Sequence, residues 1–139
     1  MPFLEIYHFN LEPQRRRDMA RDVTDGLAAA FSISPDIITT YFHNCGPDDY
    51  AHAGVLPAAP EARRMFVKVH AFPRPADRLR DAAGRITDAV AANAPVGPEN
   101  IAVYFLPRDP QEAAHAGRLV SDGEAPLPTL AAAGSGARP

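Results

Sequence analysis

The sequence predicts an α/β domain in which two tandem βαβ units form one four-stranded sheet with both helices on one face. An internal repeat is the first observation behind this prediction, because Val23-Thr24-Asp25 returns as Ile86-Thr87-Asp88, with Thr24 and Thr87 63 residues apart. The same offset carries Tyr41-Phe42 onto Tyr104-Phe105. The second observation is that each unit changes from a strand period to a helix period and back. Two strands joined by such a helical crossover lie parallel.

The first unit, residues 2–43, is predicted to form a strand, a helix and a strand. Residues 3–9 are β-branched and aromatic with a partial period of two, which is typical of a strand. A helix is expected over 13–31, with apolar residues spaced by four along one face: Met19, Val23, Leu27 and Phe31. The turn Ser34-Pro35-Asp36 then returns the chain to a strand at 37–43.

The second unit, residues 65–106, repeats this order. It begins with a strand at 65–72, and a helix follows near Pro75, a residue suited to a first helical turn. The turn Gly97-Pro98-Glu99 precedes the last strand at 101–106. We expect the helix to bury one apolar stripe: Leu79, Ala83, Ile86 and Val90.

The sheet is expected to be apolar on both faces, although the two helices can cover only one. In the central strands two sets of side chains alternate, Leu4, Ile6, Val67 and Val69 against Phe3, Tyr7, Phe66 and Phe72. This pattern indicates self-association.

The two units with their connection are expected to make a single domain over 1–118. Residues 44–64 are interpreted as a linker with room for a small hairpin. Residues 119–139 form a tail rich in Pro, Ala and Gly, which we expect to be disordered or to lie over a neighbouring subunit.

Composition excludes several classes of function. A net charge of −3 gives no basic face for nucleic acid, and no apolar run is long enough for a membrane span. The N-terminus lacks the features of a secretory signal, and Cys45 is the single cysteine, so a cytoplasmic location is expected. Because the spacing of Cys45, His43 and His52 matches no zinc pattern, no metal is expected.

Pro2 is the candidate catalytic residue. Aminopeptidases remove Met1 before a small residue such as proline, and Pro2 would then carry a free secondary amine. Such amines titrate near about 7.7–8, and burial or nearby positive charge lowers the value. A base with a pKa near ambient pH is suited to proton abstraction beside a carbonyl. The repeat pairs Pro2 with Met65, so only one unit carries this amine.

A duplicated βαβ unit that begins with proline after methionine resembles the tautomerase superfamily, whose founding member is 4-oxalocrotonate tautomerase. The resemblance covers roughly residues 2–118. It is closest to the fused, double-length group of cis-3-chloroacrylic acid dehalogenase and malonate semialdehyde decarboxylase, through four segments: Phe66-Val67, Arg74 with Ala76-Asp77, Val103-Tyr104-Phe105, and Gly117-Arg118-Leu119. It implies a homotrimer and chemistry without a cofactor.

The resemblance also implies roles for individual residues. Pro2 matches the catalytic proline, and Arg74 matches an arginine that holds the substrate carboxylate. Tyr104 matches a tyrosine that helps to activate water. Tyr104 also fits a position for aromatic packing, and the presence of its equivalent Tyr41 in the first unit favours that alternative. Arg118 is a further candidate for substrate binding.

Three departures weaken the resemblance to a hydratase or dehalogenase. A second arginine expected just before Arg74 is replaced by Ala71, Phe72 or Pro73, and a histidine expected on the first helix falls at Leu27. His115 stands in place of the water-activating glutamate, and Glu112 is the nearest carboxylate. His115 could itself act as an acid or base. The Arg-Pro-Arg motif of a decarboxylase is likewise incomplete, since this chain has Phe72-Pro73-Arg74.

These observations predict a cofactor-independent tautomerase that uses Pro2 as general base and acid on a small enol or 2-oxo carboxylic acid. The developing enolate would be stabilised by Tyr104 or His115. The alternatives are a hydratase, dehalogenase or decarboxylase acting on a three-carbon acid. A non-catalytic trimeric homologue is the third alternative, and it applies if Met1 is retained, because Pro2 is then an amide.

Overall fold

The computed structural model describes residues 1–123, and the main elements follow the predicted order. The helices and strands are β1 (Phe3–His8), α1 (Pro13–Phe31), β2 (Thr39–Asn44), β3 (Met65–Ala71), α2 (Ala76–Asn93), β4 (Ile101–Pro107), β5 (Ala114–His115) and β6 (Arg118–Leu119). Neither helix combines the length and apolar character needed to span a bilayer, within these described residues.

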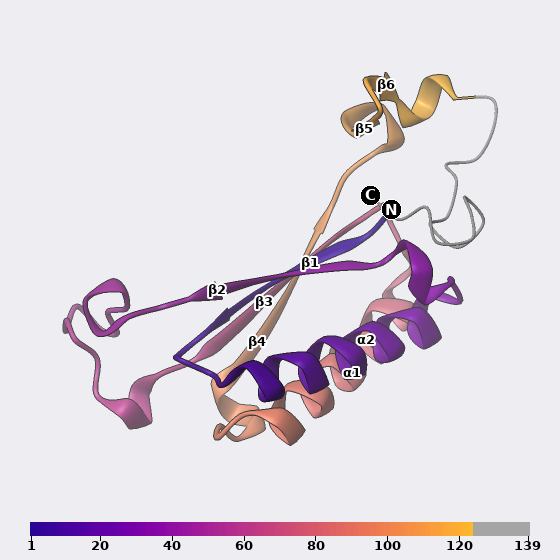
Figure 1. Cartoon of the computed structure of the whole chain (residues 1–139). Helices are drawn as coiled ribbons and strands as arrows, with labels where there is room; N and C mark the ends of the chain where they lie inside the picture. Colours follow the sequence, from indigo (N-terminus) through magenta and orange to yellow (C-terminus); the bar gives the residue numbers. More distant parts are fainter. Residues whose placement is uncertain (124–139) are drawn as a thin grey trace.

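The four long strands form one sheet in the order β2-β1-β3-β4, and both helices lie along one face of it (Figure 1). The pairs β1–β2 and β3–β4 are parallel, as a helical crossover requires, and β1 and β3 join the two units antiparallel. The predicted fold class is therefore confirmed. Glu5 and Lys68, which are equivalent in the repeat, face each other in the central pair.

The core lies between the sheet and the two helices. All four residues of the predicted stripe on α1 are buried, and so are Ile86 and Val90 on α2. Leu79 and Ala83, the other two residues of the stripe predicted on α2, are only half-buried, and Ala82 is buried in place of Ala83. The buried side of α2 runs through Ala82, Ile86 and Ala89, a spacing of four and then three that keeps to one face of a helix with 3.6 residues per turn.

Each helix contains one glycine, Gly26 on α1 and Gly84 on α2. Only Gly26 lies in close contact with the other helix. A Cβ atom at Gly26 would stand 3.1 Å from the Cβ of Arg85 and 3.6 Å from its backbone carbonyl carbon. A Cβ atom at Gly84 on α2 would meet no other atom within 4 Å.

We expect Gly84→Ala to raise the free energy of unfolding by about 0.5–1 kcal/mol, because alanine loses less backbone entropy in a helix. Gly26→Ala makes the same gain in propensity but pushes Arg85 and its helix outward, so it should be at least about 1 kcal/mol less stable than Gly84→Ala. Urea unfolding of both variants measures the difference. Equal stabilisation by the two substitutions would contradict the close packing at Gly26.

The repeat continues beyond the two βαβ units into the segments that follow β2 and β4. Ala51-His52-Ala53-Gly54 is equivalent to Ala114-His115-Ala116-Gly117 at the same offset of 63 residues. The second segment forms the β5–β6 hairpin, and the first is closed by an isolated bridge between His52 and Val55. The backbone matches as well, since φ is 52° at both Ala53 and Ala116.

Equivalent hydrogen bonds attach these two segments to the sheet. The amide of Cys45 donates to the carbonyl of His8 at 2.8 Å, and the amide of Arg108 donates to that of Ala71 at 3.0 Å. The two segments lie at opposite ends of the sheet (Figure 1). Residues 44–64 are thus the first unit's copy of the segment that follows β4.

The β5–β6 hairpin extends past the predicted boundary at residue 118. Leu119 pairs with Ala114, and the amide of Val120 donates to the carbonyl of Ala113 at 2.9 Å. A short 3₁₀ turn, Val120–Asp122, follows. The remainder of the predicted tail, residues 124–139, lies outside the described part of the chain.

Candidate active site

Pro2 is buried at the start of β1, and its carbonyl accepts a hydrogen bond from the amide of Thr39 at 3.4 Å. At this end of the sheet β1 begins, while β3 and β4 end. Phe3 therefore lies opposite His70 on β3, and Ala71 lies opposite Pro107 on β4. The antiparallel central pair thus places residues from both units around the N-terminus.

The terminal amine of the described chain belongs to Met1, and its environment lowers its pKa. Burial is the main cause, and the positive charge of Arg74 adds to it. Arg74 is therefore close enough to act on a charge at the N-terminus. Pro2, the next residue, is itself buried.

Backbone and aromatic contacts hold Arg74 in place. Its Nη1 donates to the carbonyls of Phe72 at 2.7 Å and Pro73 at 3.3 Å, and its guanidinium carbon lies 4.6 Å from the ring centroid of Phe31. Burial, followed by the charge of Arg78, lowers the pKa of Arg74. The guanidinium keeps further N–H donors for a ligand.

A pocket of about 310 Å³ opens beside the N-terminus. Its walls come from the ends of β1 and β3, from the residues after β4 and from the β5–β6 hairpin: Met1, Phe3, His70, Ala71, Phe72, Arg108, Glu112, Ala113, Ala114, His115 and Val120. The structure therefore brings His115, one of the predicted residues, to the N-terminus that carries Pro2.

A chain of hydrogen bonds fixes the wall of this pocket. Nη2 of Arg108 donates to Nδ1 of His70 at 2.7 Å. Because an arginine has no acceptor, His70 must accept at Nδ1 and carry its proton on Nε2. That Nε2–H donates to Oε2 of Glu5 at 2.6 Å, and this bond is the main cause that lowers the pKa of Glu5. The ring of His70 also stacks on Phe3, with centroids 4.2 Å apart.

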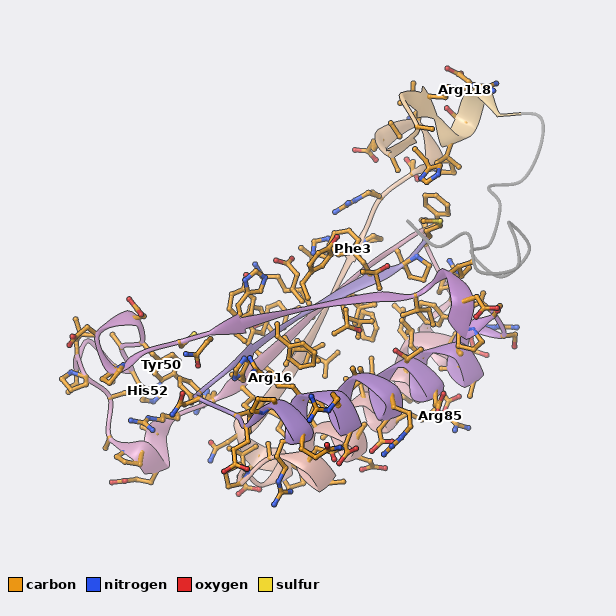
Figure 2. The ribbon with its side chains drawn as sticks, in the orientation of Figure 1. Phe3, Arg16, Tyr50, His52, Arg85 and Arg118 are labelled. Carbon is orange, nitrogen blue, oxygen red and sulfur yellow. The ribbon has the colours of Figure 1, made fainter. Side chains whose placement is uncertain are left out.

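Of the predicted residues, only His115 lines this pocket. Pro2 lines an adjoining hollow with Met1, Phe3 and Tyr41, and Arg74 lines another beside Phe31 and Phe72. Tyr104 and Arg118 lie farther away in the described chain. Tyr104 is 61% exposed on the sheet face opposite the helices, where its ring packs edge-on against Phe66 at 5.0 Å. Arg118 pairs with His115 across the β5–β6 hairpin, and Figure 2 shows it at the outer end of the molecule.

Sequence reasoning missed Arg108, His70 and Glu5. Arg108 directly follows β4, and it supplies a positive charge to this pocket, which Arg74 does not line. A prediction that β1 pairs antiparallel with β3 would have placed His70 beside Phe3. Among residues 1–123, no group of three or more His, Cys, Asp or Glu side chains could hold a metal ion.

Comparison with known proteins identifies the fold. No family model matches the sequence, and no curated protein matches it. Several solved structures share its architecture. Native fused 4-OT has a TM-score of 0.79 at 10% identity, over 86% of this chain and 96% of that one. The symmetric trimer of wild-type Q0 fused 4-OT has a TM-score of 0.74 at 15% identity, over 96% and 99%.

The third structure, Pt0534 inactivated by 2-oxo-3-pentynoate, has a TM-score of 0.74 at 11% identity, over 86% of this chain and 95% of that one. At identities this low the likeness establishes architecture alone. The described chain has the tautomerase-like fold of fused 4-OT, with two βαβ units in one polypeptide.

Proposed function

We propose that the protein is a cofactor-independent tautomerase of the cis-3-chloroacrylic acid dehalogenase-like group, acting in the cytoplasm on a small enol or 2-oxo carboxylic acid. Removal of Met1 would free the amine of Pro2. One observation carries the proposal: a pocket lined by Arg108 and His115 opens at the N-terminus, where burial and Arg74 lower the pKa of the terminal amine. A lowered pKa leaves more of the amine in the basic form at neutral pH.

In the proposed reaction the substrate carboxylate binds arginines, and Pro2 moves one proton. The guanidinium groups of Arg74 and Arg108 would hold the carboxylate, with Arg118 as a further candidate. The nitrogen of Pro2 takes the proton from the enol oxygen or from the carbon beside the carbonyl, and returns it to the other atom. His115 or Tyr104 would donate a hydrogen bond to the oxygen that carries the developing charge.

The fold neighbours support the choice of substrate and the oligomeric state. The inactivator bound to Pt0534 is itself a 2-oxo acid. The Q0 fused 4-OT structure is a symmetric trimer. In this chain Tyr41 and Tyr104 are more than half exposed on the uncovered sheet face, which suits the trimer that we propose.

A hydratase or dehalogenase is the second candidate, and Glu112 favours it. This glutamate lines the pocket beside His115, where a carboxylate could activate water. Its Oε1 already accepts the amide of Asp109 at 2.9 Å, which competes with that role. Turnover of acetylenecarboxylate would support the second candidate, and turnover of malonate semialdehyde would support a decarboxylase. If neither acid is consumed, tautomerisation is the one enzymatic activity of this proposal that remains.

Arg108→Ala should raise KM for a 2-oxo acid by about tenfold or more, because a charge-assisted hydrogen bond to the carboxylate is lost. Steady-state kinetics with phenylenolpyruvate measures the change. The matched control is Arg85→Ala, since Arg85 is exposed on α2 and pairs with Asp81. An unchanged KM for Arg108→Ala would exclude Arg108 from substrate binding.

Arg74→Gln should move the acidic limb of the pH profile of kcat/KM to higher pH. Arg74 lowers the pKa of the terminal amine, so loss of its charge raises that pKa, and the amine then becomes basic only at a higher pH. The same profile for Arg85→Gln should match that of the parent protein. A limb that stays in place would show that Arg74 does not act on the catalytic amine.

A further inference from the structure

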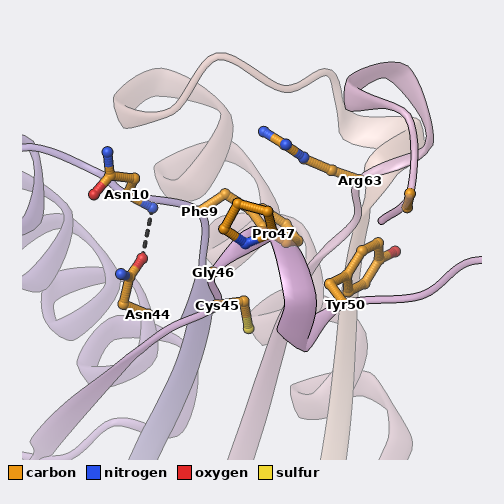
Figure 3. A pocket seen from close by; sticks show the side chains of 9 residues that line it. Phe9, Asn10, Asn44, Cys45, Gly46, Pro47, Tyr50 and Arg63 are labelled. Carbon is orange, nitrogen blue, oxygen red and sulfur yellow. Dashed lines mark hydrogen bonds between the residues drawn. The ribbon is translucent and has the colours of Figure 1, made fainter. Parts of the chain in front are cut away.

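The pocket beside Pro2 has a counterpart at the opposite end of the sheet. This second pocket has a volume of about 330 Å³ and is built by the end of β1 and by residues 44–64. Its lining residues are Phe9, Asn10, Asn44, Cys45, Gly46, Pro47, Tyr50, Ala58 and Arg63 (Figure 3). The offset of 63 residues carries Phe9, Cys45 and Tyr50 onto Phe72, Arg108 and Ala113, all of which line the pocket beside Pro2.

The second copy of the pocket keeps the cavity but lacks the catalytic group. The equivalent of Pro2 is Met65, which is buried in the middle of the chain and has no free amine. The equivalent of Arg108 is Cys45, so the positive charge at that position is lost too. Proton transfer through an N-terminal amine is therefore impossible here.

Arg63 supplies a positive charge from another direction. Its guanidinium carbon lies 5.6 Å from the ring centroid of Phe9. No carboxylate within residues 1–123 forms an ion pair with it. A guanidinium held over an aromatic ring at the wall of a pocket is well placed to bind an anion.

Phe9 and Tyr50 give the pocket rigid aromatic walls. Their rings meet edge to face, with centroids 4.9 Å apart. The hydroxyl of Tyr50 donates to the carbonyl of Ala62 at 3.2 Å and accepts from the amide of Arg64 at 3.0 Å. Since both bonds fix the Tyr50 ring, the wall is formed before any ligand enters.

Asn44 and Cys45 are further polar residues that line the pocket, and the carboxylate of Asp49 lies beside it, where it accepts the amide of Gly46 at 3.2 Å. Oδ1 of Asn44 accepts the backbone amide of Asn10 at 2.7 Å, as the dashed line in Figure 3 shows, so the NH₂ group of Asn44 remains a donor. Burial, followed by the charge of Asp49, raises the pKa of the Cys45 thiol. The thiol therefore stays neutral and does not oppose an anionic ligand.

We propose that the pocket lined by Phe9, Tyr50 and Arg63 binds a small carboxylate with a flat apolar body and does not convert it. The carboxylate pairs with Arg63, and the apolar body packs against the wall that the two touching aromatic rings form. This binding is independent of Pro2, so it holds whether or not the proposed tautomerase reaction occurs.

Cys45 gives a direct test, because it lines this pocket and is the single cysteine of the chain. The full-length protein is alkylated with N-ethylmaleimide, a neutral reagent, over a series of benzoate concentrations, and the rate is followed by intact mass. Benzoate should slow alkylation of the parent protein at least about fivefold at saturation. Arg63→Ala should need about tenfold more benzoate for the same protection, as expected for loss of one charged contact.

Three controls make the result specific. Arg64→Ala removes a neighbouring exposed arginine that does not line the pocket, and it should behave like the parent protein. Arg63→Lys keeps the charge and should retain part of the protection. Benzyl alcohol, which has no charge, should protect weakly.

A second measurement, amide NMR shifts of Asn10 and Gly46 during the same titration, reports on the pocket even if Cys45 reacts slowly. Unchanged alkylation and unchanged shifts at saturating benzoate, or equal protection of the Arg63→Ala and parent proteins, would overturn the proposal. Loss of turnover in Pro2→Ala would not bear on it, because Cys45 and both amides lie in the other pocket.

Discussion

Pro2→Ala should lower kcat/KM for the ketonisation of phenylenolpyruvate by about 10²–10⁴-fold, the usual contribution of one positioned acid–base group. The expectation follows from the burial of Pro2 and from the lowered pKa of the terminal amine at this end of the sheet. The rigid ring also holds the nitrogen lone pair in one direction, which a primary amine on alanine does not. Ultraviolet absorbance of the enol measures the rate directly.

The control for Pro2→Ala is a form that keeps proline but blocks its nitrogen. A short N-terminal extension that is not processed leaves Pro2 as an amide, and it should be as inactive as the alanine variant. Intact-mass spectrometry of the parent protein must show the loss of Met1. If the extended form, the Pro2→Ala variant and the parent protein all have equal rates, Pro2 is not the base.

Leu27→Ala should lower the free energy of unfolding by about 2–5 kcal/mol, because it leaves a cavity in a closely packed interior. Leu27 has no exposed surface and lies in the buried stripe of α1, between Val23 and Phe31. Urea unfolding, followed by circular dichroism at a fixed protein concentration, measures the loss; the concentration matters because assembly stabilises the folded state.

Leu119→Ala is the matched control, since it removes the same atoms from a side chain that is 40% exposed in the β5–β6 hairpin. We expect it to cost less than about 1 kcal/mol. Equal losses for the two variants would contradict the position of Leu27 in the core. Leu27 stands where the dehalogenase pattern has a histidine on its first helix. Because Leu27 is apolar and buried, it contributes to the core and supplies no acid–base group.

The elements could be predicted closely because their signals are local. Pro13 at the first turn and apolar residues every fourth position defined α1, and the structure confirms both of its bounds. The error at Ala83 arose because two adjacent alanines fit an apolar stripe equally well in the sequence. Packing of α2 against the rest of the core, which no local pattern contains, decides that Ala82 is the buried one.

The site was less predictable because it depends on distant pairing. Pro2 could be named from the sequence, since its chemistry comes from its place at the chain end. Arg108 and His70 come from the ends of two other strands, and only the antiparallel pairing of β1 with β3 brings them near Phe3. The missed repeat between 51–56 and 114–119 was visible in the sequence and would have revealed two equivalent segments.

Because Glu5 and Lys68 face each other across the central strands, they affect which βαβ units can associate through those strands. If two first units joined through β1, Glu5 would face Glu5, and two second units joined through β3 would place Lys68 against Lys68. Like charges directly opposite each other in a sheet are unfavourable, whereas opposite charges contribute about 0.2–1 kcal/mol. The central pair thus favours a mixed assembly over either self-pairing. If the chain were cut between its halves, the fragments should reassemble as a heterodimer.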